Sequence, residues 1–296
     1  MNSQLPEVLF HYTGQHGLIG IAQERAIWAS RIDFLNDKSE LEHALELVRD
    51  QLQIAAAGCG EHLANALKAT ENAVCLPRAM DGHRMFRWNV PHVASLSENG
   101  DLLSQWRGYC GGGSGFSIGF SRERLAHVLS ANGAELAPVI YHDSQKNDLI
   151  AKAVGDLVRE LSAAIGSEEL PSPDQMAATN KLISGFIKST SEFAPLFKDK
   201  AFAEEREWRI IVRDVVKLGF DNAKFRIGRP GPVPYISVSL LENEAQNNRI
   251  TMPIQSVILS PSTEHVVHIA VMGILSPIIS TGFSVGPSAI PLRKIE

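Results

Sequence analysis

The residues best suited to chemistry lie late in the chain, in the run Glu205-Arg206-Glu207-Trp208-Arg209. Side chains alternate between the two faces of a β-strand, so a strand that begins near Glu205 would place Glu205, Glu207 and Arg209 on one face. Two carboxylates on one face repel each other unless a cation or a ligand compensates them, and such arrangements are concentrated at functional sites. The run therefore predicts a functional pair of carboxylates. The structural alternative is an edge strand in which Arg209 is their ion-pair partner.

A second candidate lies near the N-terminus, where His11, Tyr12 and Thr13 end a short apolar segment. His11 and Thr13 are two residues apart, so on a strand they point to the same face. An imidazole and a hydroxyl group placed together could hold a ribose or a phosphate. The alternative is an ordinary strand end with a histidine whose hydrogen bonds are satisfied within the fold.

Two serines and two aromatic residues form a third candidate site. Ser95 and Ser97 would share one face of a strand, and Trp106 and Tyr109 have the spacing of neighbours on one helix face. The rings could stack on a ligand ring, whereas the alternative is that they belong to the hydrophobic core. The glycines at 111–113 would let the backbone approach a ligand closely, or would form a turn.

The segment from 30 to 42 supplies further polar side chains. Arg31 follows a predicted strand and could face an anionic ligand, the alternative being a solvated arginine. Asn36 and Asp37 are better explained as turn and cap residues, because both side chains bond readily to nearby backbone. Ser39, with Glu42 three residues later, predicts the start of a helix.

Elements that position these residues are predicted from the hydrophobic pattern. Strands are expected at residues 8–12, 26–30, 93–97, 115–120, 137–141, 208–212, 224–227, 235–240, 256–260 and 289–294. Helices are expected from residue 18, and at 39–57, 61–75, 121–129, 143–165, 172–195 and 264–275.

Strands at both ends of the chain, with long helices between them, indicate an α+β fold rather than a doubly wound one. We expect a mixed, mostly antiparallel sheet or a split sheet, with helices packed on it. No repeat or clear linker divides the sequence, so it predicts a single domain over 1–296, with helical insertions at about 38–76 and 143–198.

Composition limits the classes of function. The net charge of -5 provides no general attraction for nucleic acid, although a local basic patch is compatible with it. Cys59, Cys75 and Cys110 form no metal-binding or disulfide pattern, so no metal is expected and a reducing cytoplasm fits. Neither a secretory signal nor a membrane-spanning segment is predicted. The common phosphate-binding, protease and hydrolase motifs are absent from the sequence.

The four polar segments, in this order, resemble a bacterial family known as a domain of unknown function, number twenty-nine seventy-one. The resemblance is carried by His11-Tyr12-Thr13, by Asn36-Asp37-Lys38-Ser39-Glu40, by Ser97 with Trp106 and Tyr109, and by Glu205-Arg206-Glu207-Trp208-Arg209. It covers most of the chain, but the family name implies no activity.

A first-strand histidine, a serine strand and a late Glu-x-Glu are also similar to ADP-ribosyltransferases. This resemblance implies an ADP-ribosyltransferase-like fold, NAD as the substrate and no metal. It implies that His11 holds the ribose next to nicotinamide, with Tyr12 and Thr13 beside it, and that Ser97 supports the pocket. Trp106 or Tyr109 would stack on nicotinamide, Glu207 would be catalytic with Glu205 facing the acceptor, and Arg31 or Arg209 would neutralise the pyrophosphate.

Three functions remain open on the sequence alone. The first is an NAD-dependent ADP-ribosyltransferase or NAD glycohydrolase, with a toxin or phage-defence role, whose acceptor is a protein, a nucleic acid or water. The second is a non-catalytic module that binds a nucleotide or a protein. The third is a metal-dependent nuclease that would use Asp33, Asp37, Glu205 and Glu207 as oxygen ligands for magnesium.

Overall fold

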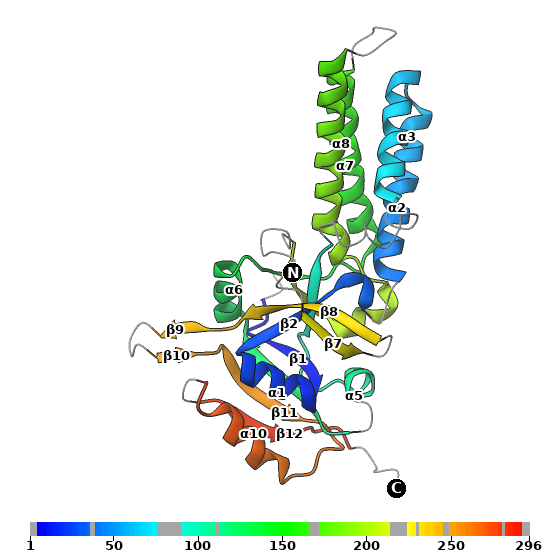
Figure 1. Ribbon diagram of the computed structural model, residues 1–296. Helices are drawn as coiled ribbons and strands as arrows, with labels where there is room; N and C mark the ends of the chain where they lie inside the picture. The colour runs from blue at the N-terminus through cyan, green and yellow to red at the C-terminus, as the bar shows by residue number, and fades with distance from the viewer. Residues whose placement is uncertain are drawn as a thin grey trace. The chain divides into compact units, whose positions relative to one another are not determined.

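A computed structural model describes residues 5–35, 39–75, 90–110, 113–165, 172–213, 224–228, 231–244, 249–279 and 282–291. Its contacts form two compact units. Unit 1 contains Met1–Arg31, His92–Val139 and Ala201–Glu296, and unit 2 contains Ile32–Pro91 and Ile140–Lys200. Unit 1 carries the sheet and unit 2 carries four long helices (Figure 1). The helices of unit 2 come from the two segments for which the sequence predicts insertions, and folding of 1–296 as one domain stays a prediction.

The sheet of unit 1 is mixed and mostly antiparallel, as the sequence predicts. In the described part of the chain, every strand pair is antiparallel except β11 with β12. Its strands are β1 (Val8–Gly14), β2 (Ala26–Arg31), β3 (His92–Ser97), β4 (Gly115–Ser121), β5 (Glu135–Pro138), β6 (Glu207–Val212), β7 (Lys224–Gly228), β8 (Gly231–Ser239), β11 (Ile254–Leu259) and β12 (Ser284–Pro287). A separate hairpin contains β9 (Glu242–Glu244) and β10 (Arg249–Thr251).

Strand β3 is the branch point of this sheet. One edge of β3 pairs with β6 along its whole length. The other edge is shared, because it pairs with β1 through Phe10 and Ser97 and with β2 through Ser30–Val93 and Arg31–His92. Strands β1 and β2 are both antiparallel to β3, so they run parallel to each other. Strand β1 pairs with one end of β3 and β2 with the other end, and the two strands diverge between these points. The sheet is thus split between β1 and β2.

Helix α1 (Gln15–Glu24) connects the two diverging strands. A Cβ atom on Gly17 would lie 1.8 Å from the Thr13 Oγ1, and one on Gly20 would lie 2.3 Å from the Trp28 ring. Real side-chain contacts are never this short, so α1 packs against β1 and β2 only because these two positions are glycine. The other α-helices that the structure describes in unit 1 are α5 (Leu103–Tyr109), α6 (Arg122–Ala131) and α10 (Val267–Leu275).

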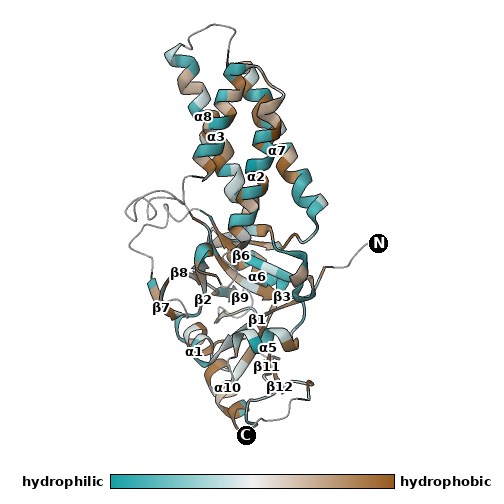
Figure 2. Cartoon of the chain, turned by 90° about the vertical axis from the view of Figure 1, so that its right-hand side faces the viewer, coloured by the Kyte–Doolittle hydropathy of each residue, from teal (hydrophilic) through white to brown (hydrophobic). Residues whose placement is uncertain are grey.

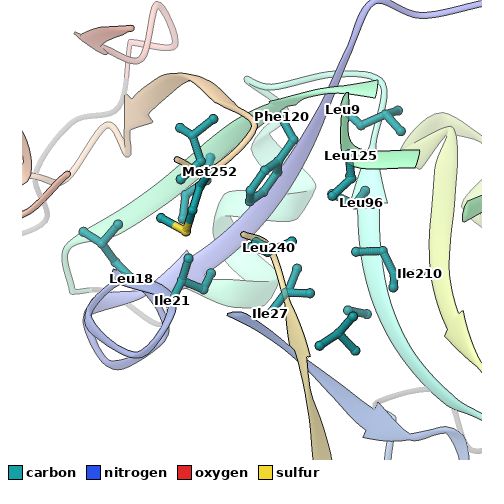
Figure 3. Packing of buried hydrophobic residues seen from close by; sticks show 14 of the residues in the cluster. Leu9, Leu18, Ile21, Ile27, Leu96, Phe120, Leu125, Ile210, Leu240 and Met252 are labelled. Carbon is teal, nitrogen blue, oxygen red and sulfur yellow. The ribbon is translucent and has the colours of Figure 1, made fainter. Parts of the chain in front are cut away.

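One face of the sheet forms a continuous hydrophobic core. Leu9, Leu96, Phe120 and Ile210 come from four different strands and meet there, with Leu18 and Ile21 of α1 and Leu125 of α6 (Figure 3). Each of these side chains is almost completely buried. Burial of one such side chain contributes about 1.5–3 kcal/mol, so this layer is what holds the diverging strands in place. The opposite face carries Ser97, Glu207 and Arg209, whereas His11 and Arg31 alternate onto the face of the core.

Unit 2 is a four-helix bundle made of α2 (Ser39–Ala57), α3 (Glu61–Cys75), α7 (Asp143–Ala164) and α8 (Pro173–Phe193). Contacts join α2 to α3, α3 to α8, α8 to α7 and α7 to α2. Hydrophobic and hydrophilic residues alternate along these helices (Figure 2), as expected when one stripe faces a bundle core. The core stripe of α7 is Ile150, Val154, Leu157 and Leu161. Short 3-10 helices lie at Ile32–Phe34 and Ala194–Leu196.

Two expected strands lie elsewhere. The strand expected at 137–141 is β5, at Glu135–Pro138. It ends at Pro138 because proline has no N–H group to donate to a neighbouring strand. Beyond it, Ile140 forms an isolated bridge with Phe197. The last strand, expected at 289–294, is β12 at Ser284–Pro287, where pairing with β11 fixes it. In the part of the chain that the structure describes, no helix is both long and apolar enough to cross a membrane.

Candidate functional site

Strands β1, β3 and β6 are neighbours in the sheet, and together they carry the three main candidates from the sequence. In their registers Phe10 lies opposite Ser97, and Ser97 lies opposite Glu207. Adjacent strands are about 4.8 Å apart, so β1 and β6 are separated by about 10 Å. His11, Ser97 and Glu207 therefore lie on three consecutive strands of unit 1, with Ser97 and Glu207 on the same face as Phe10 and His11, the neighbour of Phe10, on the other face.

His11 lies on β1 just where this strand diverges from β3. Its Nδ1 atom is 2.9 Å from the backbone oxygen of Ser95, a group that can only accept a hydrogen bond. Nδ1 must then carry the proton in this contact, which leaves Nε2 of a neutral ring as an acceptor. Burial lowers the pKa of His11, the Ser95 contact raises it, and the positive charge of Arg226 lowers it again. The resulting pKa is below the usual 6.5, so the ring is neutral at pH 7.

The lowered pKa of His11 predicts a loss of stability in acid. Its folded-state pKa is below 6.5, so the unfolded chain binds the proton first. The stabilising contribution is complete above pH 6.5 and is lost as the pH falls through the folded pKa, at up to about 1.4 kcal/mol per pH unit. We expect His11→Gln to remove this part of the pH dependence. Free energies of unfolding measured from pH 5 to 8 would contradict the prediction if the wild-type and variant curves were parallel.

Tyr12 and Trp106 hold α5 against β1. The Tyr12 hydroxyl donates to the backbone oxygen of Asn99 and accepts from the amide of Leu102, both at 2.8 Å. The Trp106 ring meets the Tyr12 ring edge-on, with centroids 4.8 Å apart. Both side chains are buried. Burial raises the pKa of Tyr12, which therefore remains a neutral phenol.

Asp101 completes this cluster. It accepts a hydrogen bond of 2.7 Å from the Trp106 Nε1 atom, and it also accepts from the Ser288 hydroxyl and the Ala289 amide. Trp106 is thus part of the packing. Tyr109 lies at the end of α5 with 43% of its surface exposed, so of the two aromatics it offers the accessible ring.

The Ser97 hydroxyl connects the end of β3 to the start of β6. It donates to the backbone oxygen of Glu205 at 2.7 Å and accepts from the Asn99 amide at 3.0 Å. Thr13 lies against Gly17 of α1. The Ser97 hydroxyl therefore holds the backbone where β3 ends and β6 begins.

The expectation that Glu205 shares a strand face with Glu207 is wrong. Strand β6 begins at Glu207, whereas Glu205 ends the 3-10 helix η4 (Lys200–Glu205). Between them Arg206 has a φ of 42°, a left-handed conformation that interrupts the alternation of side chains. Two hydrogen bonds account for this turn: the Ser97 hydroxyl binds the Glu205 oxygen, and the amide of Glu98 binds the Arg206 oxygen at 3.2 Å.

Glu207 and Arg209 do share a face, and they form a buried ion pair. Arg209 donates from Nε to Oε1 at 2.8 Å and from a terminal nitrogen to Oε2 at 3.3 Å. Their side chains are 3% and 1% exposed. The alternative given for this segment was an edge strand in which Arg209 pairs with the carboxylates. Its ion pair is present, between Arg209 and Glu207. However, β6 lies between β3 and β5 and is not an edge strand.

The segment that follows β2 is only partly described. Arg31 is the last residue of β2, lies opposite His92 and is 7% exposed, so its interpretation as a solvated arginine is wrong. Asn36 and Asp37 lie outside the described residues, as do Gly111 and Gly112. Within the described ranges, no group of three or more histidine, cysteine or acidic residues is close enough to hold a metal ion.

Arg226 of β7 is not among the candidate residues that the sequence pattern indicates. This arginine donates a hydrogen bond of 3.0 Å to the Ser30 hydroxyl, at the end of β2 that pairs with β3. Its short alternating segment, Lys224–Gly228, contains no motif. Only the pairing of β7 with β8, and of β8 with β2, brings it to the site.

Part of the chain is similar to a known protein family. No curated protein and no solved structure matches the chain. The family model described as a protein of unknown function (DUF2971) matches residues 105–210. The matched segment contains Trp106, Tyr109, Glu205, Glu207 and Arg209, whereas His11 and Ser97 precede it. The expectation of this family from the sequence motifs is thereby confirmed: over residues 105–210 the chain is similar to the proteins of unknown function DUF2971.

Proposed function

We propose that unit 1 binds NAD and cleaves the bond between nicotinamide and ribose, transferring ADP-ribose to a macromolecular acceptor or to water. The observation that supports this proposal is the register in which β1, β3 and β6 lie side by side, with Phe10, Ser97 and Glu207 in line. The resemblance to ADP-ribosyltransferases names the same three strands, through His11, Ser97 and Glu207.

The proposed chemistry uses the states found for these side chains. His11 is neutral with Nδ1 bound to Ser95, so Nε2 would accept a hydrogen bond from a ribose hydroxyl. When the bond to nicotinamide breaks, its electron pair leaves with the nicotinamide and positive charge develops on the ribose carbon. The Glu207 carboxylate would accept the 2′-hydroxyl and stabilise that charge. Arg209 would fix the orientation of the carboxylate through its two hydrogen bonds.

The acceptor would complete the reaction. Its oxygen or nitrogen lone pair forms the new bond to the ribose carbon, and its proton leaves to a base. Glu205 is half-buried just before β6, where its carboxylate would orient the acceptor or take this proton. A chain with this activity would act as a toxin or a phage-defence effector, because it would consume NAD or modify a macromolecule.

A non-catalytic module that binds a nucleotide is the second candidate. It is favoured by one observation, the burial of Glu207 and its two hydrogen bonds to Arg209, because such a pair can serve the fold alone. The nuclease hypothesis has no comparable support, since the acids it needs do not form a cluster among the described residues.

The deciding experiment is titration of the purified protein with NAD, with thermal shift and nicotinamide release followed in parallel. We expect a rise in melting temperature together with release of nicotinamide. A rise without release would favour the binding module. Neither signal, at NAD concentrations up to several millimolar, would refute both forms of the proposal.

A further inference from the structure

Glu207 is the first residue of β6, and in the ladder it lies opposite Ser97, the last residue of β3. The chain before Glu207 is not a strand, because Arg206 has a left-handed conformation and Glu205 ends a 3-10 helix. The end of a ladder opens more easily than its middle. Glu207 is nevertheless only 4% exposed. Contacts in addition to the ladder are therefore expected at the start of β6.

Glu98, the residue that follows β3, supplies these contacts. Its backbone amide donates to the backbone oxygen of Arg206 at 3.2 Å. Its carboxylate accepts a hydrogen bond of 3.0 Å from the Nε1 atom of Trp208. The other carboxylate oxygen lies 3.9 Å from a terminal nitrogen of Arg206, which is within the range of an ion pair. Glu98 thus holds the residue before Glu207 and the residue after it.

The carboxylate of Glu98 lies on the other side of the ladder from that of Glu207. Trp208 follows Glu207 directly on β6, so the two side chains point to opposite faces of the sheet. Trp208 belongs to the hydrophobic core, and Glu98 binds the indole nitrogen of this residue. An effect of Glu98 on a ligand of Glu207 would therefore pass through the chain at Arg206 and Trp208.

The conformation of Arg206 explains why such contacts matter. Its φ of 42° is in the left-handed region, which costs free energy for a residue with a Cβ atom. The amide of Glu98 and the hydroxyl of Ser97 bind the two backbone oxygens of this turn, at Arg206 and Glu205. If the turn relaxed to an extended conformation, Glu205 and Glu207 would share one face. The contacts of Glu98 oppose this change and keep two like charges apart.

We propose that Glu98 is a positioning residue for the Glu207 carboxylate, because it fixes both neighbours of Glu207 where β6 begins. In treating Glu207 as catalytic, this inference rests on the proposed function. The contacts that hold the start of β6 are independent of that function.

Truncation of the side chain tests the role of Glu98. We expect Glu98→Ala to slow single-turnover release of nicotinamide by about 10- to 100-fold, because a small displacement of a reacting group lowers rates to this extent. The affinity for NAD should stay close to that of the wild type, since the effect is on the reacting geometry. Glu98→Gln keeps an acceptor oxygen for Trp208 and should retain most of the rate. The control is Glu135→Ala, the same truncation at a half-exposed glutamate of β5, which should release nicotinamide normally.

Trp208→Phe tests the route of the effect. Phenylalanine keeps an aromatic ring in the core but has no N–H group to donate to Glu98. We expect slower release in this variant, and little further loss when Glu98→Ala is added to it, because the two substitutions remove the same contact. Losses of rate that multiply in the double variant would refute this route. An equal loss of NAD affinity and of rate in Glu98→Ala would show that Glu98 only supports the fold.

Hydrogen exchange separates this inference from the proposed function. In Glu98→Ala we expect the amides of residues 207–209 to exchange at least about tenfold faster than in the wild type, with those of 210–212 unchanged. If the wild type releases no nicotinamide, the proposed function fails, and the exchange still decides whether Glu98 holds the start of β6. If the wild type releases nicotinamide and Glu98→Ala does so equally fast, the positioning role is refuted and the proposed function stands. Melting curves of every variant identify any loss caused by unfolding.

Discussion

Glu207→Gln is expected to slow nicotinamide release from NAD by about 100- to 1,000-fold, the range measured when one group that stabilises developing charge is removed. Glutamine keeps the size of the side chain and one acceptor oxygen, so NAD should still bind with an affinity within about tenfold of the wild type. Only the negative charge is lost, and the transition state needs that charge more than the bound substrate does. The measurement is single-turnover release of nicotinamide together with calorimetric binding of NAD.

The matched control for this variant is Glu135→Gln. Glu135 lies on β5, the neighbour of β6, and its carboxylate also pairs with an arginine, Arg213, at 2.9 Å. It is about half exposed, and the residue opposite it in the ladder is Ile211, four residues beyond Glu207. We expect normal release by this control. If Glu207→Gln binds and releases as the wild type does, Glu207 is structural and the catalytic assignment is lost.

Much of the fold could be predicted from the sequence because its signals are local. The helices at Ser39–Ala57 and Glu61–Cys75 have the bounds that apolar spacing and the intervening glycines indicate. Helix α8 begins where Ser172 and Gln175 form a capping box around Pro173. Such contacts lie within a few residues of one another, so a single sequence contains them.

The part that could not be predicted depends on contacts between distant segments. The branching of β3 is fixed by pairing with Phe10 on one strand and with Ser30 on another, and no spacing within the sequence encodes that choice. The left-handed conformation of Arg206 follows from hydrogen bonds across the sheet, which displaced Glu205 from the expected face. The hydrogen bond between Arg226 and Ser30 has the same origin, because it depends on the pairing of β7 with β8 and of β8 with β2.

The ion pair of Glu207 and Arg209 predicts a large effect on stability. Arg209→Leu would leave the Glu207 carboxylate in a site that is 3% exposed, without the cation that compensates it. Breaking a buried pair by removal of one partner typically costs about 3–5 kcal/mol, and we expect a loss of this size in the free energy of unfolding. Arg213→Leu is the control, because its pair with Glu135 is partly exposed and should be worth about 1 kcal/mol or less. Denaturant unfolding can be followed by the fluorescence of Trp28, Trp106 and Trp208, all in unit 1.

The double variant Glu207→Leu with Arg209→Met decides why the pair is kept. Replacing both members of a buried pair with apolar residues of similar volume is often neutral or stabilising, so the double variant should recover most of the loss seen in Arg209→Leu. If the losses in the free energy of unfolding from the two single substitutions simply add in the double variant, each residue is needed for contacts outside the pair. A recovered double variant that still binds NAD, yet releases no nicotinamide, would mean that the fold does not require these charges. The cost of burying them would then be explained by the chemistry proposed for Glu207.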